Sequence, residues 1–254
     1  MKLTEKTYLK KYSQKIGNEI PSLIKNFNFA KTSGQFDYLK KASAVYSANI
    51  EGNSLDLNSY MNYELNKIRL KPDKEAEEIK NLIEAYSFAQ KNPLSEKNLL
   101  NCHNFFSKSL LIKSKRGKYR LEKIGVFDKS GLVYLAIEPE FVKEGMATFF
   151  DEIKTLLDST LTKEEVFYFA SLIHLRLVHL HPFQDGNGRA ARLLEKWFIT
   201  EKLGKDFWTI PSEEYYKNNR VEYYKTINIG VNFYELDYNK CLDFLKMLPN
   251  CLKL

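Results

Sequence analysis

The stretch HLHPFQDGNGRAAR, residues 179–192, gathers histidines, an acid, two glycines around an asparagine and two arginines. It lies between two long segments with helical apolar periodicity, so we expect it to be the loop that joins two helices. A capping box that starts at Thr162 opens the first helix. That helix must end by His181, because the residue before Pro182 is pushed out of helical geometry. The second helix is expected to start after Gly188.

The glycine-rich part of this stretch has the composition of an anion site. Glycine lets the backbone turn tightly, so the amides of Gly186, Asn187 and Gly188 can point outward together at the helix start, where the dipole adds positive charge. Arg189 and Arg192 are three residues apart and face roughly the same direction. Cations at a helix N-terminus are disfavoured by the dipole, and an anion between them would remove that cost.

Two further side chains suggest chemistry at this anion. Asp185 offers a hard oxygen ligand that could hold Mg²⁺ against bound phosphates. His181, at the end of the preceding helix, is placed to act as a base near neutral pH. Each feature alone is typical of an ordinary turn or surface helix, but their combination at one loop favours a phosphate site with a base.

Helical periodicity dominates the rest of the chain and predicts an all-α fold with one inserted β-hairpin. Besides the two helices around the loop, the expected helices are about 36–52, 76–92, 96–110, 140–157 and a short one in the tail, 241–254. The segment from about 117 to 137 carries three glycines and alternating β-formers instead, which predicts the hairpin.

Composition is that of an ordinary globular protein. With 254 residues, of which 44% are hydrophobic, the chain can bury a full-sized core. The net charge of +7 comes from lysines spread along the chain, so it is weak evidence for an anionic partner. Three cysteines without C-x-x-C pairing favour a reducing compartment, and no apolar run is long enough to span a bilayer. We therefore expect a cytoplasmic protein with no membrane partner.

The loop resembles the signature of the Fic family, H-x-F-x-D/E-G-N-G-R-x-x-R. Its fixed positions are all filled here, by His181, Phe183, Asp185, Gly186, Asn187, Gly188, Arg189 and Arg192. A motif with so many fixed positions rarely matches by chance. The resemblance implies a mainly helical Fic fold and an enzyme, a nucleotidyltransferase that usually moves AMP from ATP to a Ser, Thr or Tyr hydroxyl of a target protein.

The resemblance also assigns roles by motif position. His181 is the expected base for the hydroxyl proton, and Asp185 is the expected ligand of Mg²⁺ or Mn²⁺. Phe183 is expected to anchor the loop in the core. The expected phosphate-binding residues are Gly186, Asn187, Gly188, Arg189 and Arg192, the last of them at the γ-phosphate.

A second match, SANIEGNSLDL at residues 47–57, resembles the inhibitory motif S/T-x-x-x-E-G/N found in some Fic proteins. Ser47, Glu51 and Gly52 fill its fixed positions. The resemblance implies that the glutamate forms a bidentate pair with Arg192 and competes with the γ-phosphate, so that ATP binds in a pose unsuited to transfer. In some relatives the same glutamate also supports removal of AMP from the target.

The two matches divide the chain into two regions. Residues 1–92 are expected to form an N-terminal helical region with the inhibitory helix at about 36–52. Residues 93–254 are expected to form the Fic core, with the flap hairpin at about 117–137 and the catalytic loop at 181–192.

The segment NNRVEYYKTIN, residues 218–228, resembles a family segment near the adenine. Tyr223 and Tyr224 are therefore candidates to border the base, and core packing at helical spacing is an equal alternative. His103 is expected to be a satisfied core residue, and His174 and His179 carry no signal beyond that.

Partners follow from the same resemblance. The hairpin lies where the family has its flap, an edge to which a target segment adds as a strand. It has one proline where many members have two or three, which leaves the target segment open. The tail leaves no room for a DNA-binding helix-turn-helix module, and a homodimer is compatible with the sequence.

Two other functions stay open. One is transfer of another nucleotidyl or phosphoryl group. Phosphorylating relatives carry Ala-Asn-Lys at positions 186–188, so the glycines here favour nucleotidyl transfer, but ATP is not distinguished from UTP or GTP. The other is a basic helical regulatory binding protein without catalysis, which would not need His181.

Overall fold

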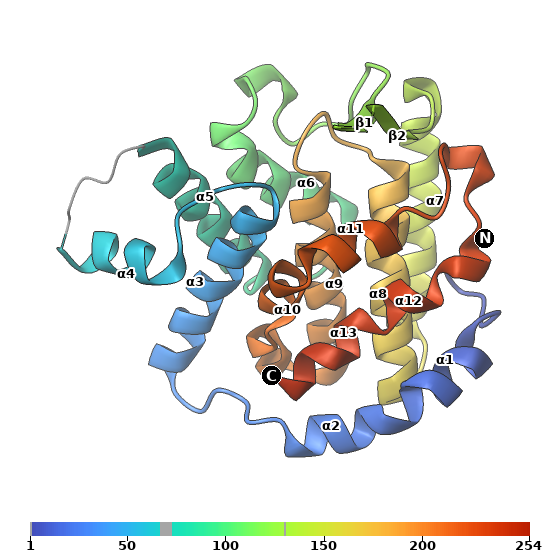
Figure 1. Ribbon diagram of the computed structural model, residues 1–254, viewed down its shortest axis with the longest axis horizontal. Helices are drawn as coiled ribbons and strands as arrows, with labels where there is room; N and C mark the ends of the chain where they lie inside the picture. Colours follow the sequence, from blue (N-terminus) through green and yellow to red (C-terminus); the bar gives the residue numbers. More distant parts are fainter. Residues whose placement is uncertain (1, 67–72, 130) are drawn as a thin grey trace.

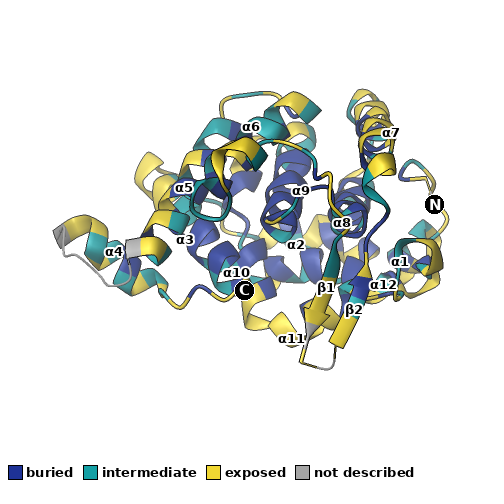
Figure 2. Cartoon of the chain, turned by 90° about the horizontal axis from the view of Figure 1, so that it is seen from above, coloured by how far each residue is buried: buried dark blue, intermediate teal, exposed yellow. Residues whose placement is uncertain are grey.

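Helices make up most of the structure, as expected, and one β-hairpin is inserted among them (Figure 1). The computed structural model describes residues 2–66, 73–129 and 131–254. Two long helices, α8 (Lys163–Leu180) and α9 (Asn187–Leu203), lie side by side in the middle of the fold. Figure 2 shows that buried residues concentrate on this pair.

Local sequence decides where this central pair begins and ends. Thr162 and Glu165 form the predicted capping box, in which each side chain accepts a hydrogen bond from the other residue's backbone amide. The first helix ends at His181, as predicted, and the second ends at Gly204, whose φ of 104° suits glycine. The loop 181–186 is therefore held at both ends by buried helices.

Other helices surround this pair. Those before it in the chain are α1 (Leu9–Lys15), α2 (Ile20–Asn26), α3 (Ser33–Ile50), α4 (Leu57–Asn66), α5 (Asp73–Ala89), α6 (Glu96–Phe106) and α7 (Pro139–Asp158). Those after it are α10 (Ser212–Asn218), α11 (Arg220–Ile227), α12 (Leu242–Leu245) and α13 (Met247–Asn250). The single tail helix that we expected is wrong: it is divided into short turns, because Pro249 lacks the N–H that a continuous helix would use.

The hairpin is shorter than the predicted segment 117–137. Its strands are β1 (Gly125–Asp128) and β2 (Gly131–Leu135), paired antiparallel with an irregularity between Val126 and Phe127. Residues 117–122 do not pair as strands, because Arg120 binds the loop between α8 and α9 through its backbone amide. Ser130, at the predicted turn, lies outside the described residues.

Helix α3, the predicted inhibitory helix, packs on α5, α9 and α10. Small residues on its inner face, Ala44, Ser47 and Ala48, are fully buried and allow a close approach. The helix ends before Gly52, whose φ of 106° is easily adopted only by glycine. Glu51, directly after the last turn of α3, contacts Arg192 near the start of α9.

The two predicted regions share one hydrophobic core. Buried residues on both sides of residue 92 belong to a single cluster, so no separate core marks a boundary there. Residues 67–72, within the predicted N-terminal region, lie outside the described residues. In the part of the chain that the structure describes, no helix combines the length and the apolar character needed to cross a bilayer.

Candidate functional site

His181 ends α8 in a left-handed backbone conformation, with φ 48° and ψ 55°. Among the described residues it is the one non-glycine with a positive φ, which costs about 1–2 kcal/mol for a residue with a Cβ. Its Nδ1 lies 3.3 Å from the carbonyl oxygen of Val178, so the ring hydrogen belongs on Nδ1 and the Nε2 lone pair is available. Burial lowers the pKa of His181 to about 4, which keeps the ring a neutral base at physiological pH.

The loop after His181 is shaped by two of its own side chains. Asn187 donates from Nδ2 to the Phe183 carbonyl at 2.8 Å and accepts the Phe183 N–H on Oδ1 at 2.9 Å. Asp185 Oδ1 accepts the Gly186 N–H at 2.5 Å. The Asn187 side chain and the Gly186 amide, both expected at the phosphates, are thus engaged within the loop. The amides of Asn187 and Gly188 belong to the first turn of α9, where helix amides lack intrahelical partners.

Arg192 is fully buried and binds the predicted inhibitory motif at the end of α3. Its Nη2 donates to Glu51 Oε1 at 2.8 Å and to the Ser47 carbonyl at 3.0 Å, while Nε donates to Ser47 Oγ at 3.0 Å. The expected contact between Glu51 and Arg192 is present. The expected bidentate geometry is wrong, because the other guanidinium nitrogens bind Ser47 and Tyr223.

The Glu51 carboxylate lies against the start of α9. A Cβ at Gly188 would overlap Glu51 Oε1 and come within 3.0 Å of Arg192 Nη1, so this approach requires glycine. Burial raises the pKa of Glu51, but the guanidinium groups of Arg192 and Arg189 outweigh burial and hold the pKa below its ordinary value. An ionised carboxylate therefore occupies the place where phosphate oxygens are expected.

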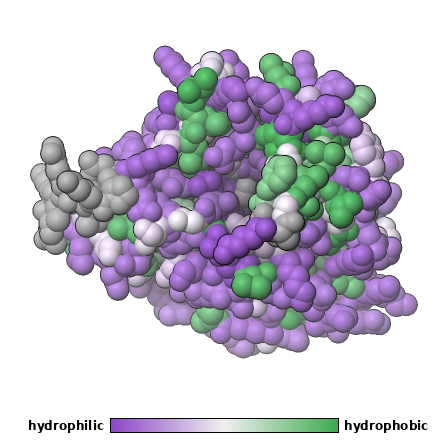
Figure 3. All heavy atoms as spheres, turned by 45° about the horizontal axis from the view of Figure 1, so that its top comes forward, coloured by the Kyte–Doolittle hydropathy of each residue, from purple (hydrophilic) through white to green (hydrophobic). Residues whose placement is uncertain are grey.

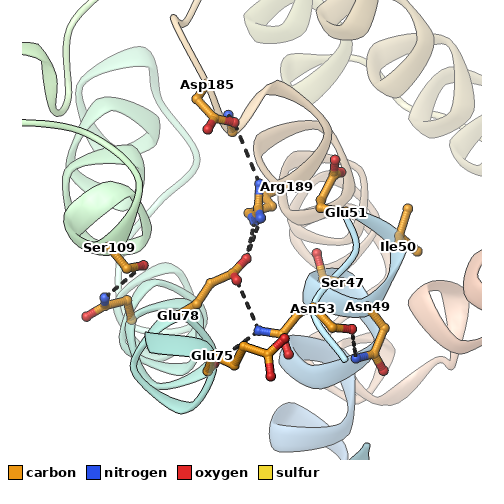
Figure 4. Close-up of polar contacts among 12 residues, drawn as sticks. Ser47, Asn49, Ile50, Glu51, Asn53, Glu75, Glu78, Ser109, Asp185 and Arg189 are labelled. Atoms are coloured by element: carbon orange, nitrogen blue, oxygen red, sulfur yellow. Dashed lines mark hydrogen bonds and ion pairs between the residues drawn. The ribbon is translucent and has the colours of Figure 1, made fainter. Parts of the chain in front are cut away.

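Arg189 meets a different carboxylate (Figure 4). Its Nε donates to Glu78 Oε1 at 2.9 Å, and its Nη1 lies 3.8 Å from Asp185 Oδ1. Glu78 Oε2 in turn accepts from Asn53 Nδ2 at 3.0 Å. The two arginines are thus paired with separate acids from α3 and α5, and not with one shared anion. Sequence reasoning missed Glu78 and Asn53 as partners in this site.

Arg120 joins the base of the flap to the loop, and sequence reasoning missed it as well. Its backbone N–H donates to the Pro182 carbonyl at 2.9 Å, and its Nε donates to the His181 carbonyl at 2.7 Å. The guanidinium also binds the Ile137 carbonyl at 2.5 Å and the Glu122 carbonyl at 2.8 Å. These bonds hold the backbone carbonyls of His181 and Pro182 and offset the cost of the left-handed conformation at His181.

His103 supports the same loop from behind. Its Nδ1 accepts the Gly117 N–H at 2.8 Å, which leaves Nε2 to donate to the Asp185 carbonyl at 3.1 Å. Its ring stacks on Phe183 with 3.9 Å between centroids. His103 is therefore a satisfied core residue, as expected, and Phe183 is fully buried beneath the loop.

The two tyrosines on α11, Tyr223 and Tyr224, differ in burial and in the residues they contact. Tyr223 is 1% exposed and its hydroxyl contacts Arg192 and His174, so it has no free face for an adenine ring. Of the two alternatives given for Tyr223, the structure agrees with packing in the core. Tyr224 is 43% exposed, and its hydroxyl donates to the Ile50 carbonyl at 3.0 Å. It therefore contacts the last turn of α3, directly beside Glu51.

The residues present can supply one carboxylate to a metal ion. The Asp185 side chain is 51% exposed and directed toward Arg189. Within residues 2–66, 73–129 and 131–254, no cluster of three or more His, Cys, Asp or Glu side chains could hold an ion. Such a donor set fits Mg²⁺, which commonly binds one or two carboxylates and takes its other ligands from phosphates and water.

Several known proteins are similar to this chain in sequence. Residues 93–199 match the model of the Fic/DOC family. The chain is 34% identical over 97 residues to protein adenylyltransferase fic-1 of Caenorhabditis elegans, and 38% identical over 78 residues to protein adenylyltransferase Fic of Nematostella vectensis. These alignments cover 38% and 31% of this chain. They span 17% and 16% of the length of the two relatives.

Solved structures share the fold. A Fic family protein from Desulfovibrio desulfuricans has a TM-score of 0.81, with 97% of this chain and 73% of that chain covered. Fic-1 from C. elegans has a TM-score of 0.70, with 96% and 71% covered. Both are 19% identical to this chain, so they establish the fold alone. This chain is therefore similar to the Fic/DOC family in sequence over residues 93–199 and shares the fold of solved Fic proteins.

Proposed function

We propose that this chain is a self-inhibited protein adenylyltransferase, which moves AMP from ATP to a Ser, Thr or Tyr hydroxyl of a target protein. One observation carries the proposal: the ionised Glu51 carboxylate lies against Gly188 and binds the buried Arg192. This place therefore accepts an anion, beside the first amides of α9 and within one loop of His181. The names of the two matched relatives add support.

In the proposed reaction, the target hydroxyl attacks the α-phosphorus of ATP. A bond forms from the hydroxyl oxygen to phosphorus, the bond to the β-phosphate oxygen breaks, and pyrophosphate leaves. His181 Nε2 takes the hydroxyl proton. The amides at the start of α9, with Arg189 and Arg192, neutralise charge that builds on the phosphate oxygens. Bound Mg²⁺ would supply further charge neutralisation at the phosphates.

The proposed inhibition follows from competition for Arg192. The guanidinium already binds Glu51 and Ser47 of α3, so a γ-phosphate can reach it only by displacing the carboxylate. Glu78 engages Arg189 from α5 in the same way. We therefore propose residues 1–92 as the regulatory region and residues 93–254 as the Fic core. By resemblance, Glu51 also supports removal of AMP.

The test of the reaction type uses ATP labelled at either end. We expect protein to retain label from α-labelled ATP and none from γ-labelled ATP, because AMP transfer carries only the α-phosphate. Label should be measured on denaturing gels with the Glu51→Gly protein. Retention of the γ-label would support phosphoryl transfer instead, and no label from any of α-labelled ATP, UTP or GTP would favour the non-catalytic alternative.

The proposed metal role of Asp185 predicts a change in magnesium dependence. We expect Asp185→Ala, in the Glu51→Gly background, to raise the Mg²⁺ concentration for half-maximal transfer by about tenfold or more, because an oxygen ligand is lost. Magnesium titrations of the initial rate measure this shift. Asp151→Ala removes an exposed acid from α7 and serves as the control. Equal magnesium dependence of all three proteins would contradict the role.

The flap is the proposed docking site for the target. Its exposed apolar side chains include Val126, Phe127, Leu132 and Leu135, and apolar side chains gather over this part of the surface in Figure 3. The outer edge of β2 is already engaged at its end, where the Leu135 N–H donates to the Val231 carbonyl at 2.9 Å. A target strand would therefore add to the edge of β1.

The proposed setting is the cytoplasm. Cys102, Cys241 and Cys251 are free and buried, as expected for a protein that needs no disulfide.

A further inference from the structure

A line of buried polar groups extends inward from Arg192. Its Nη1 donates to the Tyr223 hydroxyl at 3.1 Å, and that hydroxyl lies 2.9 Å from His174 Nε2. On the other side of the ring, His174 Nδ1 lies 2.9 Å from Glu195 Oε2. Tyr216 also donates its hydroxyl to the Glu195 carboxylate, at 2.9 Å. All five side chains are at most 1% exposed, and they come from α8, α9, α10 and α11.

Hydrogen-bond geometry gives this line one consistent direction. A guanidinium can only donate, so the Tyr223 oxygen accepts from Arg192 and its own hydrogen must point elsewhere. Among the described residues, the other hydrogen-bond partner of this oxygen is His174 Nε2, which accepts the hydrogen in the tautomer that carries its own hydrogen on Nδ1. His174 Nδ1–H then donates to the Glu195 carboxylate. The Tyr223 hydroxyl is thus fixed in orientation by the histidine behind it.

Tyr223 differs from the other partners of Arg192 in where it is attached. Ser47 and Glu51 both lie on or at the end of α3, the helix that we propose must release Arg192 before transfer. Tyr223 lies on α11, so its contact with Arg192 is not made through α3. Once the Glu51 carboxylate has left, Ser47 and Tyr223 would still bind the guanidinium, and of these two Tyr223 is the one outside α3.

We propose that Tyr223 is a positioning residue, which holds the Arg192 guanidinium in place for the γ-phosphate once Glu51 has left. The inference rests on the proposed function, because it takes the γ-phosphate as the ligand of Arg192. It replaces the expectation that Tyr223 borders the adenine. It also implies that His174 and Glu195 contribute to ligand binding, because they orient the Tyr223 hydroxyl. Preorganisation of this kind acts on one phosphate and leaves the rest of the nucleotide site unchanged.

The test compares ATP with ADP, which lacks the γ-phosphate. In the Glu51→Gly background, we expect Tyr223→Phe to weaken ATP binding by about tenfold and ADP binding by less than about twofold, because one bond that orients a charged group is lost. Isothermal titration calorimetry gives both dissociation constants. Equal weakening of ATP and ADP, or no weakening of either, would overturn the inference.

The chain offers a matched control in Tyr238→Phe. Tyr238 is also buried and its hydroxyl also lies 3.0 Å from a histidine of α8, His179, but Arg192 is not among its contacts. We expect this variant to keep the ratio of ATP to ADP affinity. If it lowers the ratio as far as Tyr223→Phe does, the effect is general loosening of the core and the inference fails.

A second pair of variants covers the case in which Tyr223→Phe does not fold. His174→Gln retains an acceptor for the Tyr223 hydroxyl and a donor for Glu195, whereas His174→Leu retains neither. We expect the ratio of ATP to ADP affinity to be kept by the first and lowered by the second. Equal ratios in the two would contradict the inference. The parent protein must prefer ATP to ADP; if it does not, the proposed function itself is at fault, whatever the Tyr223 variants do.

Discussion

Replacing Glu51 with glycine is expected to raise the rate of AMP transfer by about tenfold to a hundredfold. The physical reason is the loss of the carboxylate that binds Arg192 and lies against Gly188, which frees both for a γ-phosphate. A hydrogen bond to a charged group contributes about 1.5–3 kcal/mol, and each 1.4 kcal/mol is tenfold in a rate or an affinity. Incorporation of α-labelled ATP into protein, including self-labelling, measures the change.

The control for this variant is Asp37→Gly. Asp37 is another acid on α3, half exposed and paired with Lys40 and Lys41, and glycine there loosens the same helix without touching Arg192. We expect its rate to stay within about twofold of the parent. Equal labelling by wild type and Glu51→Gly would refute the proposed inhibition. Equal activation by Asp37→Gly would show that loosening α3, and not loss of the carboxylate, is the cause.

His181→Ala, in the Glu51→Gly background, is expected to reduce transfer by about 100-fold to 10,000-fold while ATP affinity changes by less than about twofold. The proposed base is lost, but the amides of α9 and the arginines that we propose bind phosphate remain. Because burial lowers the pKa of His181 to about 4, the neutral ring persists well below pH 6.5. We therefore expect kcat/KM of the parent with Mg²⁺ present to fall only as the pH approaches the pKa of about 4, where the ring becomes protonated.

His181→Asn distinguishes loss of the proton-accepting ring from loss of the left-handed backbone conformation at this position. Asparagine adopts the left-handed conformation more readily than most residues but takes no proton at these pH values. We expect it to be as inactive as alanine, with the loop and ATP binding preserved. Activity in either variant close to that of the parent would remove His181 from the mechanism, and lost ATP binding in both would show that its role is structural.

The central part of the fold could be predicted because its signals are local. The capping box at Thr162, the proline after His181 and the glycine at 204 each act within a few residues, so the ends of α8 and α9 follow from sequence. Short helices such as α1, α2, α4 and α10 escaped prediction, since few turns give a weak periodic signal and their stability comes from packing. The predicted position of the flap is correct, but the predicted segment is too long. Its first residues do not pair as a strand, because the backbone amide of Arg120 binds the loop between α8 and α9.

The directions of several side chains in the site could not be predicted for a related reason. The Asn187 side chain closes the loop on Phe183, and Tyr223 supports Arg192 from within the core. A sequence motif indicates that the polar groups of Asn187 and Tyr223 are important, but it does not indicate the direction in which these side chains point. Glu78 went unnoticed because an acid in a helix is ordinary until its partner, Arg189, is known.

The sequence by itself determined the similarity to the Fic/DOC family over residues 93–199, the helical class, and the loop that carries His181 and the two arginines, because these depend on residues close together in the chain. The tertiary structure decided which acid meets which arginine. Glu51 and Arg192 are 141 positions apart, and Glu78 and Arg189 are 111 apart. Contacts over such separations depend on how α3 and α5 pack against α9, and packing of whole helices fixes directions that no local pattern encodes.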